Sequence, residues 1–156
     1  MQIMRANTSH INGLNELLEQ VLNIHHEGRP DLFKGDTKKY TNEELVDIIN
    51  DDNKPIFVAV DDTGIVIGYA FCMFIQHKDN NILTDIKTLY IDDLCVREGL
   101  RGQHIGKNLY NFVLNFAKSE ACYNVTLNVW ALNTSAKAFY DSLGMKPQKY
   151  GMETIL

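Results

Sequence analysis

The segment from Leu94 to Gly106 has the residue types and the spacing best suited to binding a phosphate group. A β-type run, Thr88 to Val96, ends in a basic turn that contains glycine, and the turn leads directly into an amphipathic helix. The unpaired N–H groups of a helix's first turn, together with the helix dipole, attract anions. Arg101 adds a full positive charge, and Gly102 and Gly106 allow the backbone to approach a ligand closely. The segment therefore predicts an anion site at the start of this helix.

Two common phosphate loops do not fit this spacing. The nucleotide-triphosphate loop needs Gly-x-x-x-x-Gly-Lys-Ser/Thr, but Arg101 takes the first glycine position and Asn108 replaces the hydroxyl residue that binds magnesium. The dinucleotide fingerprint needs Gly-x-Gly-x-x-Gly, and Gly99, Gly102 and Gly106 are spaced differently. The predicted anion must therefore belong to another class of ligand.

Two carboxylates, Asp92 and Asp93, lie within the β-type run, where such residues are uncommon. Strict strand alternation would place Tyr90, Asp92, Leu94 and Val96 on one face and Ile91, Asp93 and Cys95 on the other. A carboxylate near a bound amine can deprotonate it, directly or through water. Asp92 is the first candidate for this role and Asp93 the second. The alternative is that Asp92 only binds a cationic substrate or caps a neighbouring loop.

A second motif begins at Asn133 and reads Asn-Thr-Ser-Ala-Lys-Ala-Phe-Tyr-Asp-Ser-Leu-Gly-Met. Asn133 is a natural N-cap, and Gly144 suits the C-terminal end of the same helix. Tyr140 lies on the apolar stripe of this helix, where most tyrosines are core residues with a satisfied hydroxyl. The motif thus predicts a short capped helix and leaves two interpretations of Tyr140 open.

Together the two motifs resemble those of the GNAT N-acetyltransferase superfamily. The acyl-CoA loop of that family reads Gln/Arg-x-x-Gly-x-Gly/Ala, and here the segment from Arg101 to Gly106 has His104 where glycine is usual. The family's Asn-x-x-Ala-x-x-Phe-Tyr-x-x-x-Gly-Phe is similar to the segment from Asn133 to Met145. The resemblance implies one domain over residues 1–156, of α/β class. Its mixed, mostly antiparallel sheet would be splayed at the central strand and covered by helices on both faces.

The resemblance also implies acetyl-CoA as co-substrate and direct attack by an amine on the thioester. Tyr140 would protonate the departing thiolate, and a backbone amide near Cys95 would polarise the thioester carbonyl. Cys95 itself is interpreted as a small apolar strand residue, because no histidine in the sequence is placed to activate it. The residues expected to contact acetyl-CoA are Leu94, Cys95, Val96, Arg101, Gly102, Gln103, His104, Ile105, Gly106, Lys107, Asn133, Ala136, Phe139 and Tyr140.

Two other classes of function compete with this one. A non-catalytic acyl-CoA sensor or regulatory module would use the same fold and transfer nothing. A phosphate-binding protein unrelated to CoA would account for the loop at Arg101 but not for the motif at Asn133. Tyr140 and Asp92 favour the enzyme.

The acceptor is expected to be a small-molecule or peptide amine that binds beside the loop from His25 to Asp36. The residues expected to line or gate its pocket are Glu27, Arg29, Asp31, Phe33 and Asp92. The adjacent His25 and His26 lack a further spaced ligand, so no metal site is predicted. The alternative is a polar surface loop with turns set by glycine and proline.

Hydrophobic periodicity predicts the elements that must position these motifs. The first half is expected to have a strand at Ile3 to Ala6, a helix over Ile11 to Leu22, a helix from the capping box Thr41-x-x-Glu44 through Ile49, and a hairpin of Pro55 to Val60 with Ile65 to Ile75. The second half is expected to have the strand Thr88 to Val96, a helix over Ile105 to Glu120, a strand at Val125 to Val129, a helix through Ala136 to Leu143, and closing strands at Met145 to Gln148 and Tyr150 to Ile155.

Composition narrows the class of protein. The 156 residues are 45% hydrophobic and 22% charged, which is typical of a globular domain, and the net charge of −5 argues against nucleic acid as a partner. The sequence has neither an apolar run long enough to span a membrane nor a signal-peptide core, so no membrane partner is predicted. Three cysteines without metal spacing are expected to be reduced in a cytoplasmic protein. Apolar side chains on the closing strands would favour a homodimer if they are exposed.

Overall fold

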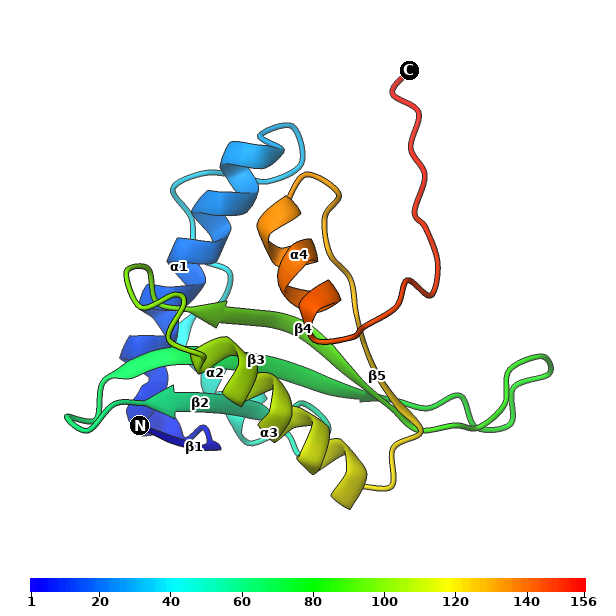
Figure 1. Ribbon diagram of the computed structural model, residues 1–156, viewed down its shortest axis with the longest axis horizontal. Helices are drawn as coiled ribbons and strands as arrows, with labels where there is room; N and C mark the ends of the chain where they lie inside the picture. Colours follow the sequence, from blue (N-terminus) through cyan, green and yellow to red (C-terminus); the bar gives the residue numbers. More distant parts are fainter.

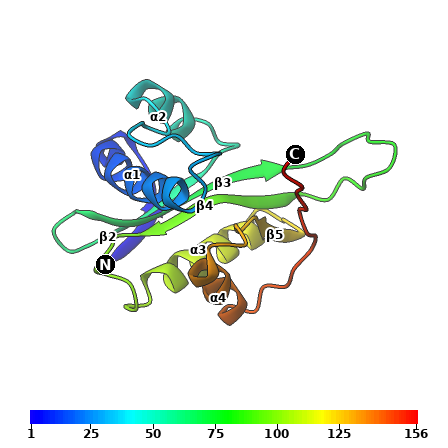
Figure 2. The ribbon, with the colours of Figure 1, turned by 90° about the horizontal axis from the view of Figure 1, so that it is seen from above.

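The fold is built on one five-stranded sheet. The computed structural model describes residues 1–156. The strands follow the order β1 (Gln2–Arg5), β2 (Ile56–Val60), β3 (Val66–Ile75), β4 (Thr88–Val96) and β5 (Asn124–Leu127). Neighbouring strands from β1 to β4 are antiparallel, whereas β5 is parallel to β4. Helices cover both faces (Figure 1, Figure 2). The mixed, mostly antiparallel α/β fold is thereby confirmed.

Four α-helices lie on the sheet, two on each face. They are α1 (Ile11–Gly28), preceded by the 3-10 turn η1 (Thr8–His10), α2 (Asn42–Ile49), α3 (Ile105–Ser119) and α4 (Thr134–Ser142). Figure 2 shows α1 and α2 on one side of the sheet and α3 and α4 on the other. None of the helices is both long and apolar enough to cross a membrane.

The helix boundaries follow local chemistry closely. The predicted capping box at Thr41 is present, because its hydroxyl accepts from the Glu44 N–H at 3.1 Å and the Glu44 carboxylate accepts from the Thr41 N–H at 2.8 Å. The predicted end of the first helix was wrong, since α1 continues through His25 to Gly28. The helix stops at Arg29 because the following Pro30 disfavours helical geometry in the residue before it.

A β-bulge at Asp92 divides β4 into two halves. In the pairing with β3, Phe71 lies opposite Asp93 and Cys72 lies opposite Ile91, so Asp92 has no counterpart. The extra residue reverses the alternation of side chains. Ile91 therefore belongs to the core beside α3, whereas Cys95 belongs to the core beneath α1 and α2. The prediction that Ile91, Asp93 and Cys95 share one face was wrong for this reason.

The sheet splays beyond the bulge. β5 pairs with β4 only between Thr88 and Ile91, and the remainder of β4 has β3 as its single neighbouring strand. The chain after β5 runs toward α4 and away from β4 (Figure 1). Backbone groups on the free side of β4 thus lack strand partners, and such groups need a partner of some kind.

The C-terminal segment differs from the prediction. Residues 145–156 form neither of the two expected closing strands, and the expected strand at Val125 to Val129 ends at Leu127. Figure 1 shows the segment running outward from the end of α4. A strand exists only through hydrogen bonds to a neighbouring edge, and in this single chain the segment meets none.

Candidate active site

The predicted phosphate loop lies open at the start of α3. Arg101, Gly102, Gln103 and His104 are all exposed. His104 adopts the left-handed conformation, with φ 61° and ψ 8°, and it is the N-cap of α3 without a side-chain cap hydrogen bond. This conformation costs a residue other than glycine roughly 1–2 kcal/mol. No side chain therefore accepts a hydrogen bond from the first-turn N–H groups of α3, and the exposed Arg101 precedes the helix by four residues.

Gly106 serves packing between two helices. A Cβ placed on Gly106 would lie 3.1 Å from Phe139 Cζ and 3.5 Å from Val96 Cγ2. The missing side chain thus makes room for the ring of Phe139 from α4. Packing against Phe139 is thus one reason for a glycine at position 106, beside the predicted approach of its backbone to a ligand.

The second motif forms α4 as predicted. The Asn133 Oδ1 accepts from the Ala136 N–H at 3.0 Å, so Asn133 caps the helix. Tyr140 is half-buried, and burial, with Asp93, Tyr110 and Cys95 nearby, raises its pKa well above the usual value. No buried side-chain polar atom lacks a partner, so the Tyr140 hydroxyl, which forms no hydrogen bond within the protein, reaches solvent. Tyr140 is therefore a protonated and available donor, unlike a core tyrosine with a satisfied hydroxyl.

Cys95 is buried, and its thiol is expected to be unreactive. Burial and the charge of Asp93 raise the pKa of its thiol to about 12, although Arg101 and Arg97 act in the opposite direction. A thiol that stays protonated at neutral pH is a poor nucleophile. This agrees with the interpretation of Cys95 as an apolar strand residue.

Gln20, which sequence reasoning missed, holds the end of β4 from α1. Its amide nitrogen donates to the Val96 carbonyl at 3.1 Å and contacts the Cys95 Sγ at 3.2 Å, and its carbonyl accepts from the Glu98 N–H at 2.8 Å. The Val96 carbonyl therefore already has a partner. Nothing in the sequence signals this, because α1 and the end of β4 meet only in the fold.

The bulge turns both acidic side chains toward the α1–α2 side of the sheet. The Asp92 carboxylate pairs with Lys39 Nζ at 2.9 Å, and the Asp93 carboxylate accepts from the Tyr69 hydroxyl at 2.7 Å. Burial raises the pKa of Asp93, and the charge of Asp92 adds to this, while Lys39, the Tyr69 hydrogen bond and His25 oppose it. A carboxylate with a raised pKa accepts a proton from an amine more readily than one with an ordinary pKa.

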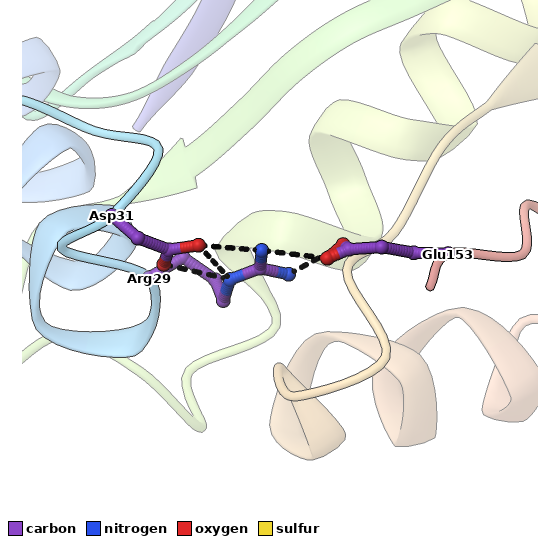
Figure 3. Close-up of polar contacts among 3 residues, drawn as sticks. All are labelled: Arg29, Asp31 and Glu153. Carbon is purple, nitrogen blue, oxygen red and sulfur yellow. Dashed lines mark hydrogen bonds and ion pairs between the residues drawn. The ribbon is translucent and has the colours of Figure 1, made fainter. Parts of the chain in front are cut away.

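The loop after α1 crosses the splay toward β5 and the C-terminal segment. The Phe33 ring lies 5.0 Å from His25 and 5.4 Å from Trp130, which follows β5. Figure 3 shows Arg29 between two carboxylates, Asp31 at 2.7 Å and Glu153 at 2.8 Å.

Three of the loop residues predicted for the acceptor pocket, Arg29, Asp31 and Phe33, thus lie together in these contacts. Glu27 does not join them, because it lies exposed in the last turn of α1 and forms no ion pair. No group of three His, Cys, Asp or Glu side chains converges as metal ligands would.

Comparison with known proteins identifies the family and the fold of the chain. The family model described as "Acetyltransferase (GNAT) family" matches residues 18–145. A mutant of the BH1408 protein from Bacillus halodurans superposes with a TM-score of 0.96 at 29% identity, over 100% of this chain and 99% of that chain. The crystal structure of glucosamine-6-phosphate N-acetyltransferase from Arabidopsis thaliana gives 0.73 at 25% identity, over 99% and 97%. In sequence, glucosamine 6-phosphate N-acetyltransferase from Arabidopsis thaliana is 33% identical over 66 residues, which are only 42% of each protein.

Proposed function

The chain belongs to the GNAT acetyltransferase family, and on that premise we propose that it transfers an acetyl group from acetyl-CoA to a primary amine. The observation that carries the proposal is the position of Tyr140. Its hydroxyl forms no hydrogen bond within the protein, and burial together with the Asp93 carboxylate raises its pKa, so that it stays protonated. Tyr140 would serve as the proton donor and Asp93 as the proton acceptor that acyl transfer to an amine requires.

We propose that acetyl-CoA binds along the free side of β4. Its pyrophosphate would accept from the N–H groups between Arg101 and Lys107, where the helix dipole and two side-chain charges favour an anion. The pantetheine amides would pair with the backbone of Leu94, like an added strand, because the Cys95 backbone faces Tyr69 of β3. Gln20 already holds the Val96 carbonyl, so that group is a poorer partner. Asn133, Ala136 and Phe139 of α4 would form the opposite wall.

The residues then divide the chemistry among themselves. We infer that Asp92 holds the ammonium of the acceptor and that Asp93 takes its proton. This modifies the expectation that put Asp92 first, because Asp92 is engaged in an ion pair while burial raises the pKa of Asp93. The Leu94 N–H on the free side of β4 stabilises the oxyanion as the amine attacks the carbonyl, since the ladder turns the Cys95 N–H, the group expected from the sequence, toward Tyr69 of β3. Tyr140 protonates the departing thiolate.

The acceptor is proposed to be a small-molecule or peptide amine that enters beside Arg29, Asp31 and Phe33. The curated relative and one of the solved structures act, by name, on an amino sugar phosphate. Arg29 is a cation at the proposed entrance that could bind such a phosphate if it exchanges Glu153 for the substrate. Glucosamine 6-phosphate therefore belongs in the first panel of amines.

Calorimetry and a thiol-release assay test the proposal together. We expect the protein to bind acetyl-CoA in the micromolar range and to release free CoA when an accepted amine is added. Binding without release across amino sugars, polyamines, amino acids and lysine peptides would favour the non-catalytic sensor. Absence of binding at millimolar acetyl-CoA would refute both.

We also propose that the C-terminal segment joins two copies of the chain. It exposes Tyr150, Met152, Ile155 and Leu156, and the outer edge of β5 has no strand partner. Apolar residues with β propensity favour addition to an open edge. Light scattering should report a dimer for the natural chain and a monomer after Met152→Glu with Ile155→Glu. A monomer in both cases would refute the interface.

A further inference from the structure

The loop before α2 presents an amine of the protein itself to the two carboxylates at the β4 bulge. Lys39 Nζ lies 2.9 Å from Asp92 Oδ2 and 5.4 Å from the ring centroid of Tyr40, which stacks on Phe71 at 5.9 Å. The Lys39 side chain is 36% exposed. Lys39 is therefore an accessible alkyl ammonium held in place by one carboxylate.

This location is the one that the proposed reaction assigns to the acceptor. An acceptor amine must arrive as an ammonium, contact a carboxylate at the bulge and lie at the edge of the splay where β4 has lost β5. Lys39 already meets the first two conditions, and the bulge residue it contacts, Asp92, is the first residue of β4 beyond the pairing with β5. An amine tethered at such a site reacts with an effective concentration far above that of a free amine.

We propose that Lys39 is a self-acetylation site, so that its Nζ takes the acetyl group from acetyl-CoA when no other acceptor is bound. The inference rests on the proposed function and on the Lys39–Asp92 contact. It names the chemical class of acceptor that this subsite accepts, which is an unbranched alkyl primary amine such as a lysine side chain.

The transfer balances with the groups in place. The Lys39 ammonium gives one proton to Asp93, and its nitrogen lone pair forms a bond to the acetyl carbonyl carbon. The carbon–sulfur bond of the thioester breaks. Tyr140 protonates the thiolate and receives the second proton lost from nitrogen. The products are an uncharged amide on Lys39 and free CoA.

Acetylation would also change the loop. An amide has no charge, so the ion pair with Asp92 disappears and the carboxylate becomes free for a cationic acceptor. The loop between α1 and α2 then keeps the stacking of Tyr40 on Phe71 but loses its ion pair with the β4 bulge. Self-acetylation would thus open the acceptor subsite.

Mass spectrometry of the intact protein and of its peptides tests this proposal directly. The purified chain is incubated with acetyl-CoA alone, and acetylation is located and timed. We expect one acetyl group per chain, at Lys39, forming at least about tenfold faster than at the adjacent Lys38. The rate should not depend on protein concentration, because the reaction is intramolecular.

Two variants supply the controls. Lys39→Arg keeps the positive charge and should abolish the modification. Lys38→Arg should leave it unchanged, since Lys38 is exposed and forms no ion pair. Uniform acetylation of exposed lysines, with no preference for Lys39, would overturn the proposal as non-enzymatic chemistry.

The two levels of inference fail separately. If calorimetry shows acetyl-CoA binding and an external amine is acetylated while Lys39 stays unmodified, self-acetylation is refuted and the proposed function stands. If acetyl-CoA does not bind, both are refuted. Modification of Lys39 that persists at the wild-type rate in Tyr140→Phe would refute the proton path.

Discussion

Replacing Gly106 with alanine tests whether α3 and α4 are held together by one aromatic contact. The new Cβ would lie 3.1 Å from Phe139 Cζ, whereas carbon atoms pack best at about 3.5–4.0 Å. The ring, or α4 with it, must therefore move by about half an ångström. Overpacking of this kind costs about 1–3 kcal/mol. Alanine in place of helical glycine returns about 0.5–1 kcal/mol.

The expected net effect of Gly106→Ala is a loss of about 1 kcal/mol in the free energy of unfolding, measured by urea titration. Gly28→Ala is the matched control, because Gly28 is also helical and a Cβ added there would have nothing within 4 Å. That change should stabilise the protein by about 0.5–1 kcal/mol. The same glycine-to-alanine substitution should thus change the free energy of unfolding in opposite directions at the two sites, because only Gly106 has the Phe139 ring beside it.

A double-mutant cycle with Phe139→Leu identifies the steric partner. In the Phe139→Leu background the clash is relieved, so Gly106→Ala should be neutral or stabilising. The coupling energy between the two sites should be about 1–3 kcal/mol. If Gly106→Ala is equally destabilising in both backgrounds, Phe139 is not its partner and the reasoning fails. Calorimetry on the same variants then tells whether acetyl-CoA affinity follows the position of α4.

Three further predictions concern single side chains of the site. Tyr140→Phe should lower kcat by about 100-fold or more while calorimetry shows unchanged acetyl-CoA affinity, and an unaltered kcat would remove it as the acid. Folding raises the pKa of Asp93. The protonated carboxyl therefore stabilises the folded state fully at any pH below the ordinary carboxyl pKa. This stabilisation is lost as the pH rises through the raised pKa. Asp93→Asn should therefore increase the free energy of unfolding at neutral pH. It should also abolish the limb of the pH–rate profile that reports the base. A lower free energy of unfolding in the variant would contradict the predicted direction. Gln20→Leu leaves the Val96 carbonyl and the Glu98 N–H unpaired, and should cost about 1–3 kcal/mol in urea unfolding, whereas no loss would mean that solvent replaces the amide.

Local pattern predicted much of the fold. The strand Thr88 to Val96 and the capping box at Thr41 match the structure, and α3 begins at the expected Ile105. These features depend on neighbours within a few residues, such as a cap, a turn or an apolar stripe. The closing strands at Met145 to Gln148 and Tyr150 to Ile155 had the same kind of local pattern and did not form, because a strand also needs a partner edge.

The features of the candidate site also divide into those set by neighbours in sequence and those set by distant segments. The phosphate loop and the motif at Asn133 were recognisable because each is a continuous run of residues. The bulge at Asp92 was not, since it arises from the register with β3 and not from the composition of β4. The same holds for Gln20, which is 76 residues from Val96 in sequence, and for Arg29, which is 124 residues from Glu153.

The sequence by itself therefore determined the family and the positions of its two motifs, because short motifs with fixed spacing carry them. Only the tertiary structure decided that Asp93 is the buried carboxylate and that Asp92 is the one paired with Lys39. Burial and charge separation are set by segments that meet across the sheet. A shift of one residue at Asp92 turned both carboxylates toward Lys39 and Tyr69, and no pattern within β4 encodes that shift.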